Sequence, residues 1–402
     1  MARSLTLCDL TQSYSASGGG IRTYLTEKRA FLDNHTQHRH VLIIPGARDT
    51  VTTEGRHITI EIASPRVPGS PNYRLLLRSR AVIKALHTQQ PDAIECLDAY
   101  NLPWAAIAYR REASGTKLIA GYRTDFPTVY VEEIARKFIG RYLAGGLQRS
   151  AYKYAGKLYS RFDGVYALNA AMAQKLKGLG GGAVDVLPLG TDLATFNPNK
   201  YDQQWRASIG ASPDSPILIY VGRIDKEKQP DVVLDAFLRL PKAMNASLVM
   251  LGDGGLKESL AKKSEGMRVH FPGFVTDRGQ LAAMLASSNI YVSAMAHETF
   301  GISIIEAQAC GLPIVGVNAG AMPDRVPPPL GLLGPVGDAA TMANNITAIW
   351  NSENIDKIKQ GARQHVETHF SWPKTFEHLF GHIYPKAASL NILREKPTFC
   401  PL

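Results

Sequence analysis

The sequence predicts an α/β protein built from two doubly wound parallel sheets, one in each half of the chain. Strand-like apolar runs alternate with helical runs, which is the pattern of parallel strands joined by crossover helices. The alternation restarts after about residue 200. With 402 residues, the chain is also long enough to form two domains that each bury a core.

The first half holds the elements of an N-terminal domain, expected over residues 1–195 and Rossmann-like in organisation. Apolar runs predict strands at 4–8, 40–44, 58–62, 93–96 and 117–121. Helical spacing predicts helices near 21–34, 73–89 and 101–113. The run Phe196–Gln203, which contains Asn and Pro, is interpreted as the linker that follows.

The second half repeats the pattern and predicts a C-terminal Rossmann-like domain over residues 200–371. Strands are expected at 217–220, 246–251, 269–272, 290–293 and 313–317. Helices are expected at 230–240, 257–264, 278–286 and around Glu306. A last segment, about 372–390, has apolar residues at helical spacing and predicts a terminal helix.

Composition excludes several classes of protein. A hydrophobic fraction of 45% with 20% charged residues is typical of a globular chain. Because there is no apolar run of 18 residues, and the start of the chain lacks the apolar core of a signal peptide, we expect a cytoplasmic protein. Cys8, Cys96, Cys310 and Cys400 are scattered, which favours separate thiols over a metal site or a disulfide framework.

Charge is distributed unevenly along the chain. Residues 1–200 hold 26 Lys and Arg against 16 Asp and Glu, while the remaining residues hold 19 of each. The whole excess of +10 therefore lies in the first half. A basic field on one side favours an anionic partner, such as nucleic acid, an anionic membrane or a phosphorylated substrate. A basic surface that only confers solubility is the alternative.

Two carboxylates mark the most informative segment of the second half. Glu298 and Glu306 are separated by seven residues. The residues that follow are typical of a helix ending at Gly311 and a strand starting at Pro313. Glu298 is therefore expected on the loop after the strand at 290–293, and Glu306 one to two turns into the next helix.

This placement puts two acceptors at the edge where open α/β sheets bind ligands, and sugars offer pairs of hydroxyls. A solvated surface position is the alternative for each carboxylate. With Phe300, Gly301 and Ile302 inside it, the segment resembles the E-x7-E signature of retaining glycosyltransferases with the GT-B fold, especially glycosyltransferase family 4. The resemblance implies that Glu298 contacts sugar hydroxyls, that Glu306 contacts ribose hydroxyls, and that the three residues between them line the donor site.

The GT-B resemblance also implies which ligand each half of the chain binds. The domain over 1–195 would bind the acceptor, and the domain over 200–371 would bind the nucleotide-sugar across a cleft. The terminal helix of about 372–390 would pack back on the first domain.

Residues that could hold a diphosphate follow the strand at 217–220. Arg223 and Lys228 match the family motif G-R-x-x-x-x-K. A guanidinium fork and an ammonium can stabilise the charge of a departing nucleoside diphosphate without a metal. Lys226 and Glu227 are expected on the solvated face. We expect no cofactor and no metal, since the nucleotide-sugar is a co-substrate.

Glycine-containing turns supply the remaining donor contacts that the resemblance implies. Gly19 and Gly20 open a helix after the first strand, where backbone can approach an anion. A flexible loop is the alternative there. Gly273 and Phe274 resemble the family's base-binding turn. Backbone contacts of this kind do not reveal whether the base is uracil, guanine or adenine.

A departure from the family occurs at Arg123, in the run Tyr122-Arg-Thr-Asp125-Phe-Pro. The resembling subgroup, which includes glycolipid mannosyl-, glucosyl- and sulfoquinovosyltransferases, has His at this position. Arginine cannot act as a base at neutral pH. Altered donor or acceptor specificity, retained activity with no special role for Arg123, and lost activity remain open. Asp125 could orient the acceptor hydroxyl or could be a turn residue.

The segment from Glu132 to Arg161 carries seven basic residues, beginning at Arg136, among apolar and aromatic ones, and has no acidic residue after Glu133. Such a composition suits an anionic membrane surface, and Gly145-Gly146 is expected to divide the segment into two helices. The alternative is a pair of core-packed helices with solvated basic faces.

Together these features predict a retaining hexosyltransferase that uses a UDP- or GDP-sugar and acts on a lipid or glycan acceptor, located in the cytoplasm or peripherally on the inner membrane face. No nucleic-acid partner is expected. Two alternatives remain: another GT-B enzyme with a soluble or polysaccharide acceptor or epimerase activity, and a non-catalytic protein that binds sugar-nucleotides or nucleic acid.

Overall fold

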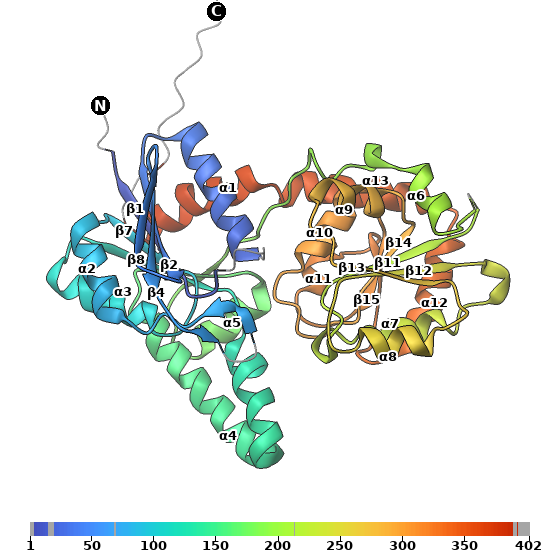
Figure 1. Cartoon of the computed structure of the whole chain (residues 1–402), viewed down its shortest axis with the longest axis horizontal. Helices are drawn as coiled ribbons and strands as arrows, with labels where there is room; N and C mark the ends of the chain where they lie inside the picture. Colours follow the sequence, from blue (N-terminus) through green and yellow to red (C-terminus); the bar gives the residue numbers. More distant parts are fainter. Residues whose placement is uncertain (1–3, 15–19, 68–69, 213, 389–391, 393–402) are drawn as a thin grey trace, which may run out of the picture. The chain divides into compact units, whose positions relative to one another are not determined.

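The structure is a computed structural model that describes residues 4–14, 20–67, 70–212, 214–388 and 392 (Figure 1). The chain divides into two compact units. Unit 1 comprises Met1–Pro188 together with Trp372–Leu402, and unit 2 comprises Leu189–Ser371. Each unit contains one large sheet of parallel strands, so the predicted α/β class with two doubly wound sheets is confirmed.

The sheet of unit 1 has the order β10-β9-β8-β7-β1-β2-β4-β3, and only β3 runs antiparallel to its neighbour. Its strand order reverses between β1 and β7, which is the topological switch point of such sheets. The strands are β1 (Thr6–Leu10), β2 (Arg39–Gly46), β3 (Thr50–Glu54), β4 (His57–Ala63), β7 (Ala93–Cys96), β8 (Lys117–Tyr122), β9 (Gly164–Ala167) and β10 (Val184–Val186). A separate pair, β5 (Arg66–Val67) and β6 (Ser70–Arg74), occupies part of the helix that was predicted at 73–89.

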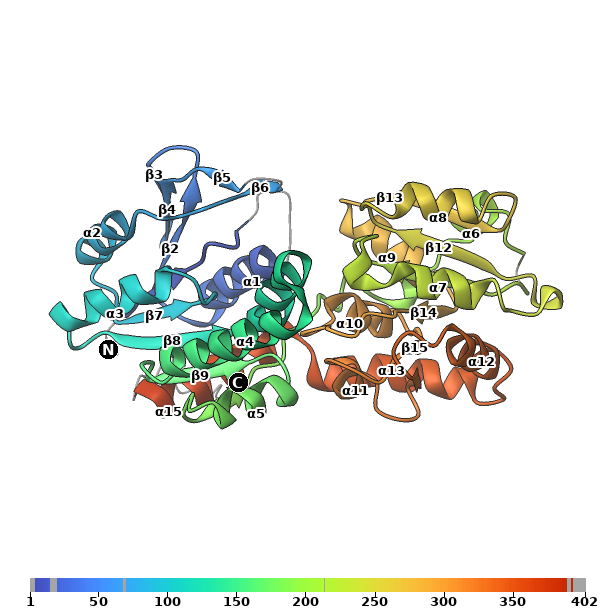
Figure 2. The same ribbon diagram turned by 90° about the horizontal axis from the view of Figure 1, so that it is seen from below.

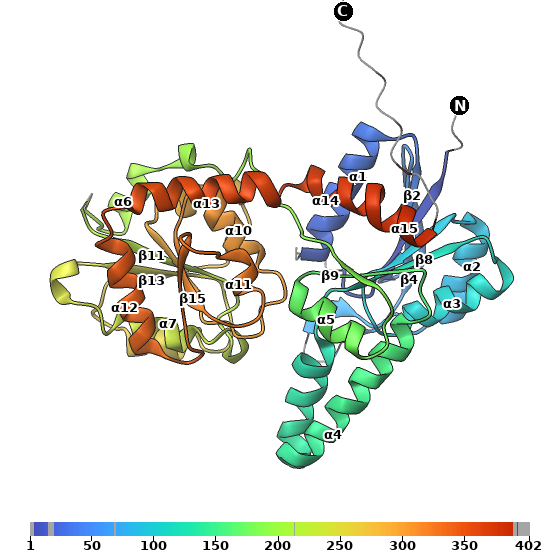
Figure 3. The same cartoon turned by 180° about the vertical axis from the view of Figure 1, so that it is seen from behind.

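Helices cover both faces of this sheet. Helices α2 and α3 lie side by side on one face of the sheet (Figure 2). Their buried residues, such as Val82 and Leu102, belong to the hydrophobic cluster on that face. On the other face lie α1 and the C-terminal helices, which pack on α1, β8 and β9 (Figure 3). The helices of unit 1 are α1 (Gly20–His35), α2 (Ser79–Gln89), α3 (Leu102–Glu112), η1 (Pro127–Glu132), α4 (Glu133–Tyr159), α5 (Ala170–Gly178), α14 (Trp372–His378), η5 (Leu379–Ile383) and α15 (Tyr384–Ala388).

The segment that joins η1 to the end of α4 doubles back on itself and projects from unit 1 (Figure 1). The Tyr152 hydroxyl lies 2.7 Å from Thr128 Oγ1, and Gln148 Nε2 donates to the same oxygen. A straight helix would separate residues 128 and 152 by about 36 Å. Since these two residues are in contact, the chain reverses between them. The helix assignment runs unbroken from Glu133 to Tyr159, so the predicted division at Gly145-Gly146 stays a prediction.

Unit 2 has a six-stranded sheet with the order β13-β12-β11-β14-β15-β16, all parallel. Its switch point lies between β11 and β14. The strands are β11 (Ile217–Val221), β12 (Ser247–Leu251), β13 (Val269–Gly273), β14 (Ile290–Val292), β15 (Ile314–Val317) and β16 (Gly331–Gly334). The helices are η2 (Pro198–Lys200), α6 (Gln203–Ser208), η3 (Lys226–Lys228), α7 (Pro230–Phe237), η4 (Lys242–Met244), α8 (Lys257–Lys263), α9 (Arg278–Ala286), α10 (Ile302–Ala309), α11 (Met322–Arg325), α12 (Ala339–Trp350) and α13 (Ile355–His369). In Figure 1, α9, α10 and α13 lie on one face of the sheet, and α7, α8 and α12 lie on the other.

The core of each unit follows the strand pattern. Strands such as β11 and β14 are buried along their length, as expected when helices cover both faces of a parallel sheet. Cys8, Cys96 and Cys310 are buried free thiols, in agreement with the prediction of separate thiols. Cys400 lies outside the described residues.

Candidate functional site

The switch point of unit 2 collects most of the residues predicted to bind a donor. Arg223 and Lys228 follow the carboxyl end of β11, and Glu298 follows the carboxyl end of β14. These two strands are hydrogen-bonded neighbours. Ligands of open α/β sheets bind outside the carboxyl ends of strands at such a point.

Two glycines allow the neighbouring loops to pack closely at this edge. A Cβ on Gly252, after β12, would lie 1.9 Å from the carbonyl oxygen of Gly222. A Cβ on Gly254 would lie 2.6 Å from the Ile224 carbonyl. Both glycines have positive φ, at 137° and 158° respectively. The turn therefore has a steric reason for its glycines, since it supports the loop that carries Arg223.

Arg223 is held by two carboxylates of its own loop. Its guanidinium donates to Asp225 at 2.8 Å and to Glu227. The Arg223 side chain remains 61% exposed, so this arrangement leaves it accessible from solvent. Glu227 is only 22% exposed and pairs with Arg223, so the expected solvated position of Glu227 is wrong. Spacing alone did not identify these two acidic partners.

Lys228 and Glu298 form an ion pair across the switch point. Lys228 Nζ donates to Glu298 Oε2 at 3.0 Å, and the backbone N–H of Gly301 donates to Glu298 Oε1 at 3.1 Å. Both side chains are largely buried, with exposures of 23% and 16%. As predicted, Glu298 lies on the loop after β14. The pair therefore places a cation beside a carboxylate that can accept hydrogen bonds from hydroxyls, at the carboxyl ends of β11 and β14.

Glu306 lies one turn into α10, as its spacing predicted, and its side chain is 3% exposed. Burial raises the pKa of Glu306, although the neighbouring guanidinium of Arg278 acts in the opposite direction. Arg278 donates to Glu306 Oε1 and its guanidinium lies 4.5 Å from the centre of the Phe196 ring. Sequence reasoning missed Arg278 because it comes from α9, which lies elsewhere in the chain.

The residues between the two carboxylates shape the turn into α10. Gly301 has a φ of 80°, and a Cβ there would lie 2.4 Å from Ile304 Cδ1, so only glycine fits without strain. Ile302 begins the helix. Phe300 is buried beneath the guanidinium of Arg325, at 4.2 Å from its ring centre. Phe300 therefore supports the turn from inside unit 2.

The other predicted donor residues lie in separate places. Gly273 ends β13 with a φ of 89°, and Phe274 beside it is exposed. Gly20 begins α1 in unit 1, and Gly19 lies outside the described residues.

Arg123 follows the carboxyl end of β8 in unit 1 and is buried. Its Nη1 donates to the Tyr166 hydroxyl at 3.3 Å, and its guanidinium lies 4.3 Å from the centre of the Tyr24 ring. Burial acts to lower the pKa of Arg123, but Tyr166, Tyr24 and Glu95 outweigh it and raise the pKa. The residue is therefore a permanent cation at the carboxyl edge of the sheet.

Asp125 is surrounded by donors from its own unit. Tyr122, Tyr152, Thr128 and Lys175 donate to its carboxylate at 2.8, 2.7, 3.1 and 3.0 Å. The backbone N–H of Thr128 also donates to the Asp125 carbonyl at the start of η1. Its role as a turn residue is thus visible, and a role toward an acceptor stays a prediction.

Asp98 is a candidate that sequence reasoning missed. It follows β7 at the switch point of unit 1, where Thr11 Oγ1 and the Gln12 backbone N–H donate to its Oδ2. Burial raises the pKa of Asp98 to about 6. Its position after a strand was the available signal, but no motif surrounds it.

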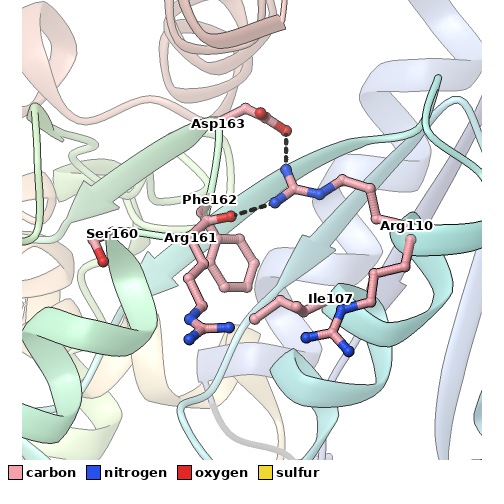
Figure 4. Close-up of a pocket in the computed structure, with 7 residues that line it drawn as sticks. Ile107, Arg110, Ser160, Arg161, Phe162 and Asp163 are labelled. Carbon is pink, nitrogen blue, oxygen red and sulfur yellow. Dashed lines mark hydrogen bonds and ion pairs between the residues drawn. The ribbon is translucent and has the colours of Figure 1, made fainter.

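A group of basic residues in unit 1 lies away from the carboxyl edge of its sheet. A hollow of about 430 Å³ is lined by Ile107, Arg110, Arg111 and the residues from Ser160 to Asp163 (Figure 4). Arg110 donates to Asp163 at 3.0 Å and to the Arg161 carbonyl at 2.7 Å. Because Asp163 immediately precedes β9, the hollow lies at the amino edge of the sheet.

The returning arm of α4 has a buried face and a basic face. Tyr152, Ala155, Leu158 and Tyr159 are buried. The exposed residues of the basic face, spaced four apart, are Arg149, Lys153 and Lys157. This arm packs one face into unit 1 and leaves a basic row exposed, a geometry that the core-packed alternative and contact with an anionic surface have in common. The side chains of the outgoing arm, including Arg136, lie outside the described residues. Within the described part of the chain, no helix combines the length and the apolarity needed to cross a bilayer.

Comparisons with known proteins agree with this geometry. Residues 18–195 match the family described as Glycosyltransferase Family 4, and residues 202–365 match Glycosyl transferases group 1. The chain is 30% identical over 328 residues to the GDP-mannose-dependent alpha-(1-6)-phosphatidylinositol dimannoside mannosyltransferase of Mycobacterium tuberculosis, covering 78% of this chain and 79% of that protein.

Two further similarities extend the comparison. The sulfoquinovosyl transferase SQD2 of Arabidopsis thaliana is 27% identical over 340 residues, covering 80% of this chain and 64% of that protein. The structure of sucrose-phosphate synthase from Thermosynechococcus elongatus superposes with a TM-score of 0.76 at 19% identity, covering 96% of this chain and all of that one. This structural likeness concerns the fold alone.

The two α/β units and these family matches together show a retaining nucleotide-sugar-dependent glycosyltransferase with the GT-B fold. Within that class, the chain belongs to glycosyltransferase family 4.

Proposed function

We propose that this enzyme transfers a hexose from a UDP- or GDP-sugar to a hydroxyl of a membrane lipid or glycolipid. The observation that carries the donor part is the Lys228–Glu298 pair at the switch point of unit 2. The acceptor part is supported by two relatives whose names refer to a phosphatidylinositol dimannoside and to sulfoquinovosyl transfer.

The donor contacts follow from charge and position in unit 2. Arg223 and Lys228, two of the three cations in the loop after β11, bind the diphosphate, because they lie at the switch point with Glu298 and match the family motif. Glu298 accepts from sugar hydroxyls and Glu306 accepts from ribose hydroxyls. Each of these acidic and basic groups already has an internal partner, so donor binding exchanges one set of charged contacts for another.

The nucleobase end of the donor site is proposed at the carboxyl end of β13. Gly273 offers backbone groups in a left-handed turn, and the exposed ring of Phe274 lies next to it. An aromatic face can stack on any nucleobase, so these contacts do not select one.

Proton transfer is proposed to occur on the departing phosphate, which takes the proton of the acceptor hydroxyl during front-face attack. Arg123 cannot act as a base, and the Asp125 carboxylate is engaged by four donors. Arg223 and Lys228 then stabilise the charge on the leaving group.

Unit 1 is proposed to bind the acceptor. Arg123 supplies a cation at the carboxyl edge of β8 that can pair with an anionic group, such as a uronate, a sulfonate or an acceptor phosphate. Asp125, which is held by Thr128 of η1 and Tyr152 of α4, is proposed to orient the acceptor hydroxyl.

The membrane surface is proposed to contact the projecting segment of η1 and α4, with the enzyme peripheral on the cytoplasmic face. The basic and aromatic composition of the segment and the exposed row of Arg149, Lys153 and Lys157 support an anionic lipid surface.

A turnover screen tests this proposal. Purified enzyme is incubated with UDP-, GDP- and ADP-sugars, with and without vesicles of phosphatidylglycerol that contain diacylglycerol or phosphatidylinositol, and nucleoside diphosphate release is measured. We expect release from one donor that increases with vesicles. Release without lipid dependence favours a soluble acceptor, and nucleotide binding without release from any donor favours a non-catalytic binding protein.

A charge-reversal variant separates membrane contact from net charge. Arg149→Glu, Lys153→Glu and Lys157→Glu together should abolish the stimulation by vesicles. The matched control changes three exposed lysines of unit 2 to Glu, namely Lys242, Lys262 and Lys357. Equal loss in both variants would contradict a specific role for the α4 row.

A further inference from the structure

One face of the sheet in unit 1 carries an unusual number of buried charged groups. Side chains alternate between faces along a strand, so Asp9 on β1 and Glu95 on β7, which are register partners, lie on the face covered by α1 and α15. Lys28 of α1 bridges them, with Nζ at 2.7 Å from an oxygen of each carboxylate. All three side chains are fully buried.

Glu95 accepts from four donors that come from three segments of the chain, α1, β9 and α15. Besides Lys28, the hydroxyls of Tyr24, Tyr166 and Tyr384 donate to Glu95 at 2.8, 2.6 and 3.0 Å. A carboxylate can be buried at low energetic cost when such donors form hydrogen bonds with its oxygens. The three tyrosine hydroxyls therefore restrain one another, because all of them donate to the same carboxylate.

Tyr166 reaches Glu95 by crossing a neighbouring strand. It lies on β9, and β8 separates that strand from β7. The residue opposite Tyr166 on β8 is Gly121, where a Cβ would lie 2.6 Å from the Tyr166 hydroxyl oxygen. Gly121 therefore leaves the space through which the tyrosine ring reaches the cluster.

Arg123 is the outermost member of this cluster. It lies two residues after Gly121, on the same face of the sheet, and its guanidinium contacts the Tyr166 hydroxyl and the Tyr24 ring. The cluster then contains two carboxylates, one ammonium and one guanidinium. Replacing Arg123 by a neutral residue would remove the positive charge that interacts with Tyr166, Tyr24 and Glu95.

We propose that the Glu95 cluster positions Arg123 for substrate binding: Glu95 fixes the Tyr166 hydroxyl, and Tyr166 with the Tyr24 ring fixes the guanidinium. Tyr166 and Glu95 are thus positioning residues, and Arg123 is the group that meets an oxyanion of the substrate. This inference rests on the proposed function, because it assigns Arg123 to the substrate-binding edge.

Two tyrosines form a matched pair for the test. Tyr166→Phe and Tyr384→Phe each remove one hydroxyl that donates to Glu95 in a fully buried site. Only the Tyr166 hydroxyl also contacts Arg123. We expect Tyr166→Phe to lower kcat/KM by about tenfold, and Tyr384→Phe by less than about twofold, with similar losses of Tm. Equal effects of the two variants on kcat/KM would overturn the proposal.

The Arg123→Gln background tests whether Tyr166 acts through Arg123. In that background, Tyr166→Phe should change kcat/KM by less than about twofold, since the positioned group is gone. A persistent loss would show that Tyr166 acts otherwise and would overturn the proposal. Full activity of Arg123→Gln alone would refute the role given to Arg123 in the proposed function.

A readout that needs no turnover covers the case of an unidentified donor. Phenylglyoxal modifies accessible arginines, and mass spectrometry measures its rate at Arg123. We expect this rate to rise by about tenfold in Tyr166→Phe and to stay unchanged in Tyr384→Phe. An unchanged rate in Tyr166→Phe would contradict the positioning of Arg123, whatever the enzyme transfers.

Discussion

Lys228→Met should reduce transfer more than Arg223→Met, although both remove one cation from the same loop. A charge-assisted contact with the donor diphosphate is worth about 1.5–3 kcal/mol, which is about tenfold or more in rate. Lys228 is largely buried and also pairs with Glu298 at 3.0 Å, so its loss leaves that carboxylate without its cation. We expect kcat/KM to fall about a hundredfold in Lys228→Met.

Arg223→Met should cost only about tenfold in kcat/KM, because the Arg223 side chain is 61% exposed and solvent screens its charge. The assay is nucleoside diphosphate release under single-donor conditions, with Tm measured to exclude unfolding. Glu298→Gln combined with Lys228→Met should lose less than the sum of the two single losses, since the residues are in contact. A larger loss in Arg223→Met, or strict additivity of the Glu298 and Lys228 losses, would refute this reasoning.

Three further predictions concern stability. Gly301→Ala should destabilise unit 2 by about 2–4 kcal/mol in urea unfolding, because alanine is strained at a φ of 80° and its Cβ collides with Ile304; an unchanged midpoint would contradict this. Arg278→Ala should lower Tm more than Arg278→Ala combined with Glu306→Gln, since only the first leaves a buried carboxylate without its cation. Burial lowers the pKa of His40 from 6.5 to about 4. Between pH 6.5 and pH 4 the His40 ring therefore binds a proton in the unfolded chain but not in the folded one. The free energy of unfolding consequently falls as the pH falls through this window. Relative to His40→Gln, we expect the wild type to lose about 3 kcal/mol from pH 7 to pH 4, measured by urea unfolding, and parallel curves would exclude the effect.

The pH prediction for His40 depends on contacts that no local pattern reveals. Arg29 Nε is a donor and lies 3.0 Å from His40 Nδ1, so the ring hydrogen resides on Nε2, which donates to Asp9 at 2.7 Å. Protonation of Nδ1 would break the contact with Arg29 and add a charge beside it. In the sequence, His40 is simply the first residue of the strand predicted at 40–44.

Local pattern was sufficient for the elements around the donor site. The apolar run of β14, the left-handed Gly311 after α10 and the strand β15 follow from periodicity and capping. The helix predicted at 73–89 was placed too early. Residues Ser70–Arg74 form β6, and α2 begins only at Ser79. Nor could local pattern predict the contacts of Thr128 with Tyr152 and Gln148, which bring the two arms of the projecting segment together.

By itself, the sequence determined the α/β class, the two sheets, and the placement of Glu298 and Glu306 on a loop and a helix, because these depend on periodicities of two and 3.6 residues and on local turns. The tertiary structure alone decided the partners: Lys228 with Glu298, Arg278 with Glu306, and Arg123 with Tyr166 and Glu95. These contacts join residues that are 28 to 71 positions apart. Strand order and side-chain direction bring such residues together, and neither is encoded in the local spacing of the residues concerned.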